Sequence, residues 1–182
     1  LIAEMPLLQH LQPRDNQRHS KVSFDVAPAL ASHAPSVKSM GITGQLTGSR
    51  ADLIIADDVE SANNSQTQLM RDRLSETVKE FDAIIKPKVG RIVFLGTPQT
   101  EMSLYNSLEE RGYKTKIWTA LYPTKEQIIG YGNKLATIIG KVLNKEGQPT
   151  DPERFNEIDL MERQSSYGRS GFNLQFMLDT TM

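Results

Sequence analysis

The stretch LIIADDVE, residues 53–60, joins a short and continuously apolar run to three carboxylates. An apolar run of this length suits a central parallel strand that is covered on both faces. In open α/β sheets, ligands lie beyond the carboxyl ends of the strands, and Asp57 and Asp58 stand at that position. The stretch therefore predicts a central strand with an acidic site at its end.

The segment that follows has the periodicity of an amphipathic helix. Asn63, Asn64 or Ser65 is expected to cap this helix, and Pro87 is expected to end it. Its apolar stripe, with steps of three and four residues, consists of Met70, Leu74, Val78, Phe81 and Ile85. A helix in this place would be the crossover to the next strand.

The order of the next segments predicts the architecture. Residues 92–95 read IVFL, and residues 115–121 are a third strand candidate. Ser103 is expected to cap a short helix between them that runs to Glu110. The alternation of strands and helices predicts an α/β core over residues 1–123, with a mostly parallel central sheet flanked by helices.

The remaining regions read as short strands before this core and as helices after it. Residues 22–26 and 37–42 have the pattern of two short strands. Residues 124–182 are expected to be helical, with a helix start at Asp151-Pro152 and a break near Gly168. One predicted helical face consists of Leu135, Ile138, Ile139, Val142 and Leu143.

Paired carboxylates at a strand end have a specific role in ATPases. One carboxylate holds Mg²⁺, usually through water, and the next one orients and deprotonates the attacking water. Asp57 and Asp58 are therefore candidate magnesium ligands and catalytic residues. The alternative is a solvated turn that happens to be acidic.

Two other features would extend a nucleotide site. Gly96-Thr97-Pro98-Gln99 ends the next apolar strand, where a small hydroxyl or amide can contact a γ-phosphate; the alternative is a plain strand-ending turn. Arg50 precedes the acidic strand and could stabilise transition-state charge, as arginine fingers do. The alternative for Arg50 is a surface or buried ion pair, for which Asp52 is one candidate partner.

The chain lacks the phosphate-binding loop that such a site needs, G-x-x-x-x-G-K-[ST]. The nearest candidate is Gly140-Lys141, but Val142 follows it and Leu135 occupies the first glycine position. This chain is therefore expected to be unable to complete an ATP site by itself.

Composition excludes several other classes of function. The 182 residues include no cysteine, which excludes disulfides, thiol catalysis and cysteine-ligated zinc. The net charge of −1 gives no strong overall field toward nucleic acid or an anionic membrane. No apolar run reaches the roughly 18 residues of a membrane span.

Several stretches resemble the large terminase subunits of short-tailed double-stranded DNA phages. Residues 43–60, TGQLTGSRADLIIADDVE, resemble the acidic-strand region of that family, and residues 93–99, VFLGTPQ, resemble its coupling motif. Three later stretches fit the same family: IWTALYP at 117–123, GQPTDPERF at 147–155 and GFNLQFML at 171–178. The similarity runs from about Val22 to the end of the chain.

The resemblance implies a partial P-loop NTPase (RecA-like) domain of a motor that uses ATP and Mg²⁺ to pump viral double-stranded DNA into a procapsid. It implies that Asp57 is the magnesium-side carboxylate, that Asp58 takes the place of the water-activating acid, and that Thr97–Gln99 couple hydrolysis to movement. Arg50 becomes a candidate nucleotide- or neighbour-sensing residue. The implied partners are viral DNA, a portal protein, a small terminase subunit and further copies in a ring, docked on the procapsid in the host cytoplasm.

Two departures from the family pattern matter. Many large terminases carry Glu where this chain has Asp58, which is one methylene shorter, so Glu60 is a second candidate for the water-activating role. The phosphate loop is expected before Leu1, and an endonuclease domain is expected after Met182. The isolated chain is therefore expected to hydrolyse ATP weakly or not at all.

Two other functions stay open on the sequence. A helicase-like ATPase also uses a strand-end acidic motif with a threonine-containing relay. A non-catalytic DNA-binding or assembly module would carry the same carboxylates for structural reasons.

Overall fold

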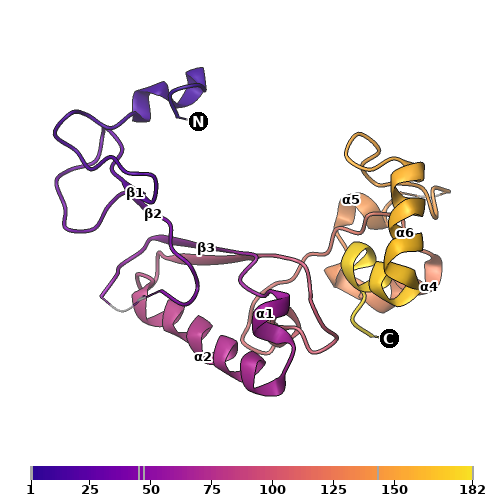
Figure 1. Ribbon diagram of the computed structural model, residues 1–182. Coiled ribbons are helices and arrows are strands. Elements are labelled where there is room, and N and C mark those ends of the chain that lie inside the picture. Colours follow the sequence, from indigo (N-terminus) through magenta and orange to yellow (C-terminus); the bar gives the residue numbers. More distant parts are fainter. Residues whose placement is uncertain (1, 45, 47, 143, 182) are drawn as a thin grey trace. The chain divides into compact units, whose positions relative to one another are not determined.

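The computed structural model describes residues 2–44, 46, 48–142 and 144–181 (Figure 1). Gln45 and Thr47 of the quoted acidic-strand stretch, and Leu143 of the predicted helical face, lie outside the described residues. Internal contacts divide the chain into two compact units, each described by itself. The first unit is Leu1–Ile54 with Thr77–Ile92, and the second is Ile55–Glu76 with Val93–Met182. The division predicted at residue 123 is a different one and stays a prediction.

Two predicted strands of the α/β core are present and form a parallel pair. They are β3 (Leu53–Asp57) and β4 (Arg91–Leu95). At the start of the pair the Arg91 N–H donates to the Asp52 carbonyl at 3.0 Å, and just past its end the Asp58 N–H donates to the Leu95 carbonyl at 2.9 Å. Both strands therefore begin at one edge and end at the other, which confirms a small parallel sheet.

The expectation that both faces of this sheet are covered is wrong for the described residues. Leu53 and Ile55 keep 53% and 59% of their surface exposed, whereas Ala56 is buried. In β4, Val93 and Leu95 are also exposed. A continuous apolar run shows that both faces are apolar, but it does not show that this chain supplies a cover for each.

The crossover between the strands contains α1 (Ala62–Ser65) and α2 (Gln68–Ile84). Ser61 is the N-cap of α1, and Asn64 completes a capping box by accepting from the Ser61 N–H at 2.8 Å. The predicted cap of the amphipathic helix at residues 63–65 is wrong, because α2 begins at Gln68 and the Thr67 hydroxyl accepts from the Met70 N–H at 3.3 Å.

The predicted apolar stripe of α2 is confirmed in its middle. Leu74, Val78 and Phe81 are at most 5% exposed. The stripe is wrong at its ends: Met70 is exposed, and Ile84 rather than Ile85 is the last buried residue because the helix ends there.

The rest of the first unit has little regular structure. A 3₁₀-helix, η1, covers Pro6–Leu11, and β1 (Ser23–Phe24) pairs antiparallel with β2 (Val37–Lys38). Both strands are shorter than the sequence predicts. Polar contacts hold the loop around them, including an ion pair between Arg18 and Asp25 at 3.1 Å.

The third predicted strand, residues 115–121, does not join the sheet. Its backbone bonds instead to C-terminal segments: Ile117 accepts from the Ala136 N–H at 2.9 Å, and the Ala120 N–H donates to the Phe176 carbonyl at 2.8 Å. The predicted strand is therefore wrong: the segment forms only single bridges, from Ile117 to Leu135 and from Leu121 to Pro149, and its hydrogen-bond partners come from residues farther along the chain. This segment runs between two small apolar clusters of the second unit, centred on Tyr131 and on Phe172.

The C-terminal half is helical, as predicted, but more broken. Its first elements are α4 (Lys125–Tyr131), η2 (Gly132–Lys134) and α5 (Thr137–Gly140). Because the helix is interrupted, the predicted single face is wrong. Leu135 and Ile139 are buried, whereas Ile138 is 74% exposed.

The last helix starts later than the sequence predicts. Asp151 accepts from the Arg154 and Phe155 N–H groups in a single turn, and α6 (Glu157–Phe172) begins after Asn156. Asn156 forms the capping box with Asp159, so the stronger N-terminal signal lies five residues beyond Asp151.

The break near Gly168 is confirmed. Gly168 has φ 69° and ψ 174° inside α6, a conformation that only glycine adopts readily. A π-helical turn, η3 (Asn173–Met177), follows. Of the helices in the described part of the chain, none combines the length and apolar composition needed to cross a bilayer.

The burial of α2 gives a stability prediction. Replacing Phe81, which is 4% exposed, with alanine is expected to lower the free energy of unfolding by about 3–5 kcal/mol, because the aromatic contacts are lost and a cavity remains. Urea-induced unfolding followed by circular dichroism measures this change. The neighbouring exposed Glu80→Ala is the control, with an expected change within about 0.5 kcal/mol. Equal effects of the two variants would contradict the buried stripe.

Candidate active site

The ends of β3 and β4 lie side by side. The hydrogen bond from the Asp58 N–H to the Leu95 carbonyl joins the residue after β3 to the last residue of β4. Asp57 ends β3 and Asp58 follows it, while Gly96–Gln99 follow β4, so the structure brings these two predicted groups to one edge of the sheet. This is the edge where ligands of open α/β sheets bind.

The side chains of Asp57 and Asp58 are exposed. Asp58 has φ +46°, in the left-handed region that aspartate tolerates better than most residues. The strand therefore ends in a sharp turn at Asp58, with both carboxylates open to solvent.

Glu60 has a different environment from the two aspartates. It is only 2% exposed, and its carboxylate accepts three hydrogen bonds. Oε1 accepts from the Gln99 N–H at 2.8 Å, and Oε2 accepts from the Ser103 hydroxyl at 3.1 Å and from the Leu104 N–H at 2.5 Å. These bonds tie the chain after β3 to the segment after β4 and to the first turn of α3 (Leu104–Ser107).

Ser103 caps α3, as predicted, through a bond from the Tyr105 N–H at 3.3 Å. The helix is shorter than the predicted span to Glu110, and turns follow it up to Gly112. The cap and the Glu60 carboxylate together supply acceptors for the free N–H groups at this helix start.

Hydrogen bonds to its backbone atoms hold the segment Thr97–Gln99 in place. Pro98 is buried, and its carbonyl accepts from the Gln175 side-chain amide of η3 at 2.8 Å. The Gln99 side chain donates to the Thr97 carbonyl at 3.2 Å. The segment is thus contacted both from the end of β3 and from the C-terminal helical region of the same unit.

Tyr105 is a residue of this edge that sequence reasoning missed. Burial first, and with it the charges of Glu60, Asp58 and Asp57, raises the pKa of the Tyr105 hydroxyl to about 12, so the phenol is protonated at neutral pH. Its ring packs over Gly96, where an added Cβ would lie 1.9 Å from the hydroxyl oxygen. Gly96 and Tyr105 are nine residues apart, and no sequence pattern predicts their contact. The bond from Gln175 to Pro98 likewise has no sequence signal.

Arg50 belongs to the first unit, whereas the residues described above belong to the second. Its guanidinium donates to the Ser49 carbonyl at 2.9 Å. Asp52 pairs with Lys86 at 2.8 Å, and an ion pair of Arg50 stays a prediction. The role of Arg50 at a nucleotide stays a prediction.

The donor set of this edge suits a hard cation bound together with a ligand. Within the described residues, no group of three or more His, Asp or Glu side chains is placed to hold a metal ion by itself. Mg²⁺ is usually held by one or two carboxylates with waters and substrate phosphates, so the two exposed aspartates fit that manner of binding. Magnesium and ATP binding here stay predictions.

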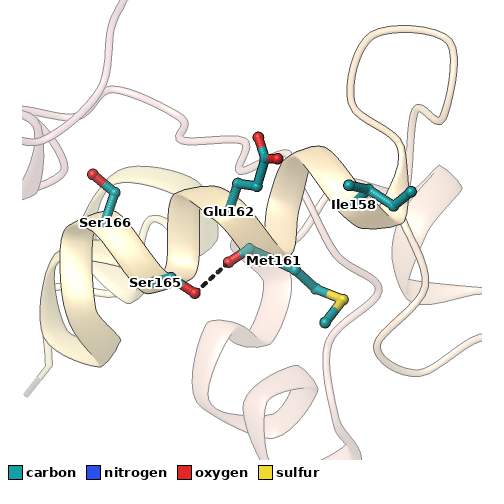
Figure 2. A pocket seen from close by; sticks show the side chains of 5 residues that line it. All are labelled: Ile158, Met161, Glu162, Ser165 and Ser166. Atoms are coloured by element: carbon teal, nitrogen blue, oxygen red, sulfur yellow. Dashed lines mark hydrogen bonds between the residues drawn. The ribbon is translucent and has the colours of Figure 1, made fainter.

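A shallow pocket lies on the outer face of α6 and contains none of the predicted site residues. Ile158, Met161, Glu162, Ser165 and Ser166 line it, all from one helix (Figure 2). The Ser165 hydroxyl is bonded to the Met161 carbonyl at 2.9 Å. Such a one-sided and open surface offers no convergent groups for chemistry.

Comparison with known proteins supports the family resemblance. The chain is 53% identical, over an alignment of 190 positions that covers all of it, to a protein named terminase, large subunit, of Enterobacteria phage T3. The chain spans 32% of the length of that relative. No protein-family model matches the chain. The resemblance of the quoted stretches to large terminase subunits is therefore confirmed.

The close approach of Tyr105 to Gly96 gives a packing prediction. Gly96→Ala is expected to lower the free energy of unfolding by about 1–3 kcal/mol, because the new methyl group overlaps the phenol. In the Tyr105→Ala background the same change is expected to have little effect, and a double-mutant cycle from urea unfolding measures that difference. Gly130→Ala is the matched control, since nothing lies within 4 Å of its added Cβ. Additive losses for residues 96 and 105 would show that they do not touch.

Proposed function

We propose that this chain is part of a terminase large subunit, the ATP-driven motor that packages viral double-stranded DNA into a procapsid. Two findings support the proposal: the identity of 53% with the phage T3 relative over the whole chain, and the pairing of the β3 and β4 ends. Because the chain spans 32% of that relative, the activity is proposed for the longer protein.

One observation carries the mechanistic part of the proposal. The Asp58–Leu95 backbone bond brings the acidic strand end and the residues after β4 to one edge, with both aspartates open to solvent. A phosphate and its metal ion need both groups within reach at once.

Each group has a proposed role. Asp57 holds Mg²⁺ on the bound ATP, and Asp58 orients and deprotonates the attacking water. Thr97 and Gln99 contact the terminal phosphate and report its loss. The domain would be a P-loop NTPase (RecA-like) fold whose phosphate loop comes from residues outside this chain.

Glu60 is less suited than Asp58 to activate water. Its carboxylate is buried and already accepts three hydrogen bonds, whereas a general base must reach the water it deprotonates. We assign the water-activating role to Asp58, with Glu60 as a support for the edge.

The proposed partners follow from the family. They are viral double-stranded DNA, a portal protein, a small terminase subunit and further copies of the same protein in a ring on the procapsid, inside the host cell. The endonuclease that cuts concatemeric DNA is proposed for another part of the longer protein. Neither the helicase-like ATPase nor the non-catalytic module has an observation in its favour that the terminase reading lacks.

Removing either aspartate charge tests the proposal in the full-length protein. Asp57→Asn and Asp58→Asn are each expected to lower ATP turnover by about 10²–10³, because each removes charge or proton transfer at the transition state. A phosphate-release assay measures this turnover.

Asp52→Asn is the matched control for these variants. Asp52 is exposed and pairs with Lys86, so its loss is expected to change turnover by less than about threefold. Full ATP turnover in both Asp57→Asn and Asp58→Asn would support the non-catalytic module instead.

A further inference from the structure

Two side chains from different segments form hydrogen bonds with the backbone of Pro98 and Gln99. The Glu60 carboxylate accepts from the Gln99 N–H at 2.8 Å, and the Gln175 amide donates to the Pro98 carbonyl at 2.8 Å. The two bonds engage adjacent residues, so a shift of this segment changes both. All four residues belong to the second unit.

Glu60 connects this segment to the acidic strand end. It lies two residues after Asp58, and its other oxygen holds Ser103 and Leu104 at the start of α3. Because the carboxylate is buried and fully bonded, it has little freedom to change partners without moving the segments that it holds. A displacement of Asp57 and Asp58 is therefore expected to move Gln99 as well, through Glu60 and its hydrogen bond to the Gln99 N–H.

Gln175 connects the same segment to the C-terminal helices. It lies in η3, where the neighbouring Phe176 carbonyl accepts from the Ala120 N–H at 2.8 Å and the Met177 carbonyl accepts from the Tyr131 hydroxyl at 2.6 Å. Phe176 also stacks on Phe172 at a centroid distance of 5.0 Å. The π-helical turn is thus anchored in the C-terminal packing, and Gln175 is its contact to Pro98.

We propose that Glu60 and Gln175 are positioning residues that transmit the state of the strand-end site to the C-terminal helices through the Pro98–Gln99 backbone. This inference rests on the proposed ATPase function of the same edge. Neither residue acts on the substrate. Their loss separates hydrolysis from the movement that it drives.

Gln175 provides the sharper test, because it is outside the acidic edge and only half-buried. Gln175→Glu keeps the size of the side chain but removes the donor to the Pro98 carbonyl, and Gln175→Lys restores an N–H donor of similar reach. Gln164→Ala, at an exposed position on α6, is the control. The assay uses the full-length protein with procapsids and linear DNA, and it records kcat and KM for ATP and the length of DNA packaged per ATP hydrolysed.

We expect the Gln175 variants to change the DNA length packaged per ATP but not the kinetics of ATP hydrolysis. Gln175→Glu is expected to keep kcat and KM within about twofold. It is expected to lower the DNA length per ATP by about fivefold, the factor that one hydrogen bond of ordinary strength represents. Gln175→Lys is expected to recover most of that ratio, and Gln164→Ala to match the unmodified protein.

Glu60→Gln gives a second, independent reading. The substitution removes the charge and leaves one acceptor, so it is expected to lower kcat by less than about tenfold, against about 10²–10³ for Asp58→Asn. It is also expected to lower the DNA length per ATP. If urea unfolding shows that this variant does not fold, the comparison of Gln175→Glu with Gln175→Lys still tests the relay.

Different results would overturn the relay through Pro98–Gln99 and the proposed ATPase function. An unchanged DNA length per ATP in Gln175→Glu, with Asp58→Asn inactive, overturns the relay and leaves the proposed ATPase intact. A loss of turnover in Glu60→Gln as large as in Asp58→Asn identifies Glu60 as the base and also overturns the relay. Full turnover in both Asp57→Asn and Asp58→Asn overturns the proposed function itself.

Discussion

The parallel pairing of β3 with β4 is the constraint on which the site depends. Parallel strands end at the same edge of a sheet, so the direction of the pair decides that residues 57–58 and 96–99 meet. The backbone bond from Asp58 to Leu95 fixes that meeting at 2.9 Å just past the strands. An antiparallel arrangement of the same two segments would have put the acids and the Gly96–Gln99 turn at opposite ends.

One short stretch places three carboxylates in two environments. Asp57 and Asp58 are open to solvent, as the binding of a metal ion or a water molecule requires, while Glu60 is buried among backbone and hydroxyl donors. A buried charge is tolerated only when its hydrogen bonds are made, and here three donors make them. The stretch therefore combines two exposed carboxylates with a buried one that holds the neighbouring segments in place.

The C-terminal helical region shows how tertiary contacts replaced local preference. Residues 115–121 have the pattern of a strand, yet their backbone partners are residues such as Ala136 and Phe176, and the sheet gains no third strand. Ala136 and Phe176 are distant from this segment in sequence, so no window along the chain could select them as its partners. The start of α6 is a different case, because the capping box at Asn156 is itself a local signal and competes with the helix-start signal of Asp151-Pro152.

The sequence by itself determined the two apolar strands, the stripe of α2, the break at Gly168 and the residue types that follow each strand, because periodicity and glycine geometry are local properties. It also carried the family resemblance. Only the tertiary structure decided that Glu60 is buried, that Tyr105 covers Gly96, and that Gln175 reaches Pro98 from 77 residues away. The physical reason is that burial and hydrogen-bond partners depend on which distant segments pack together, and the chain encodes that packing only as a whole.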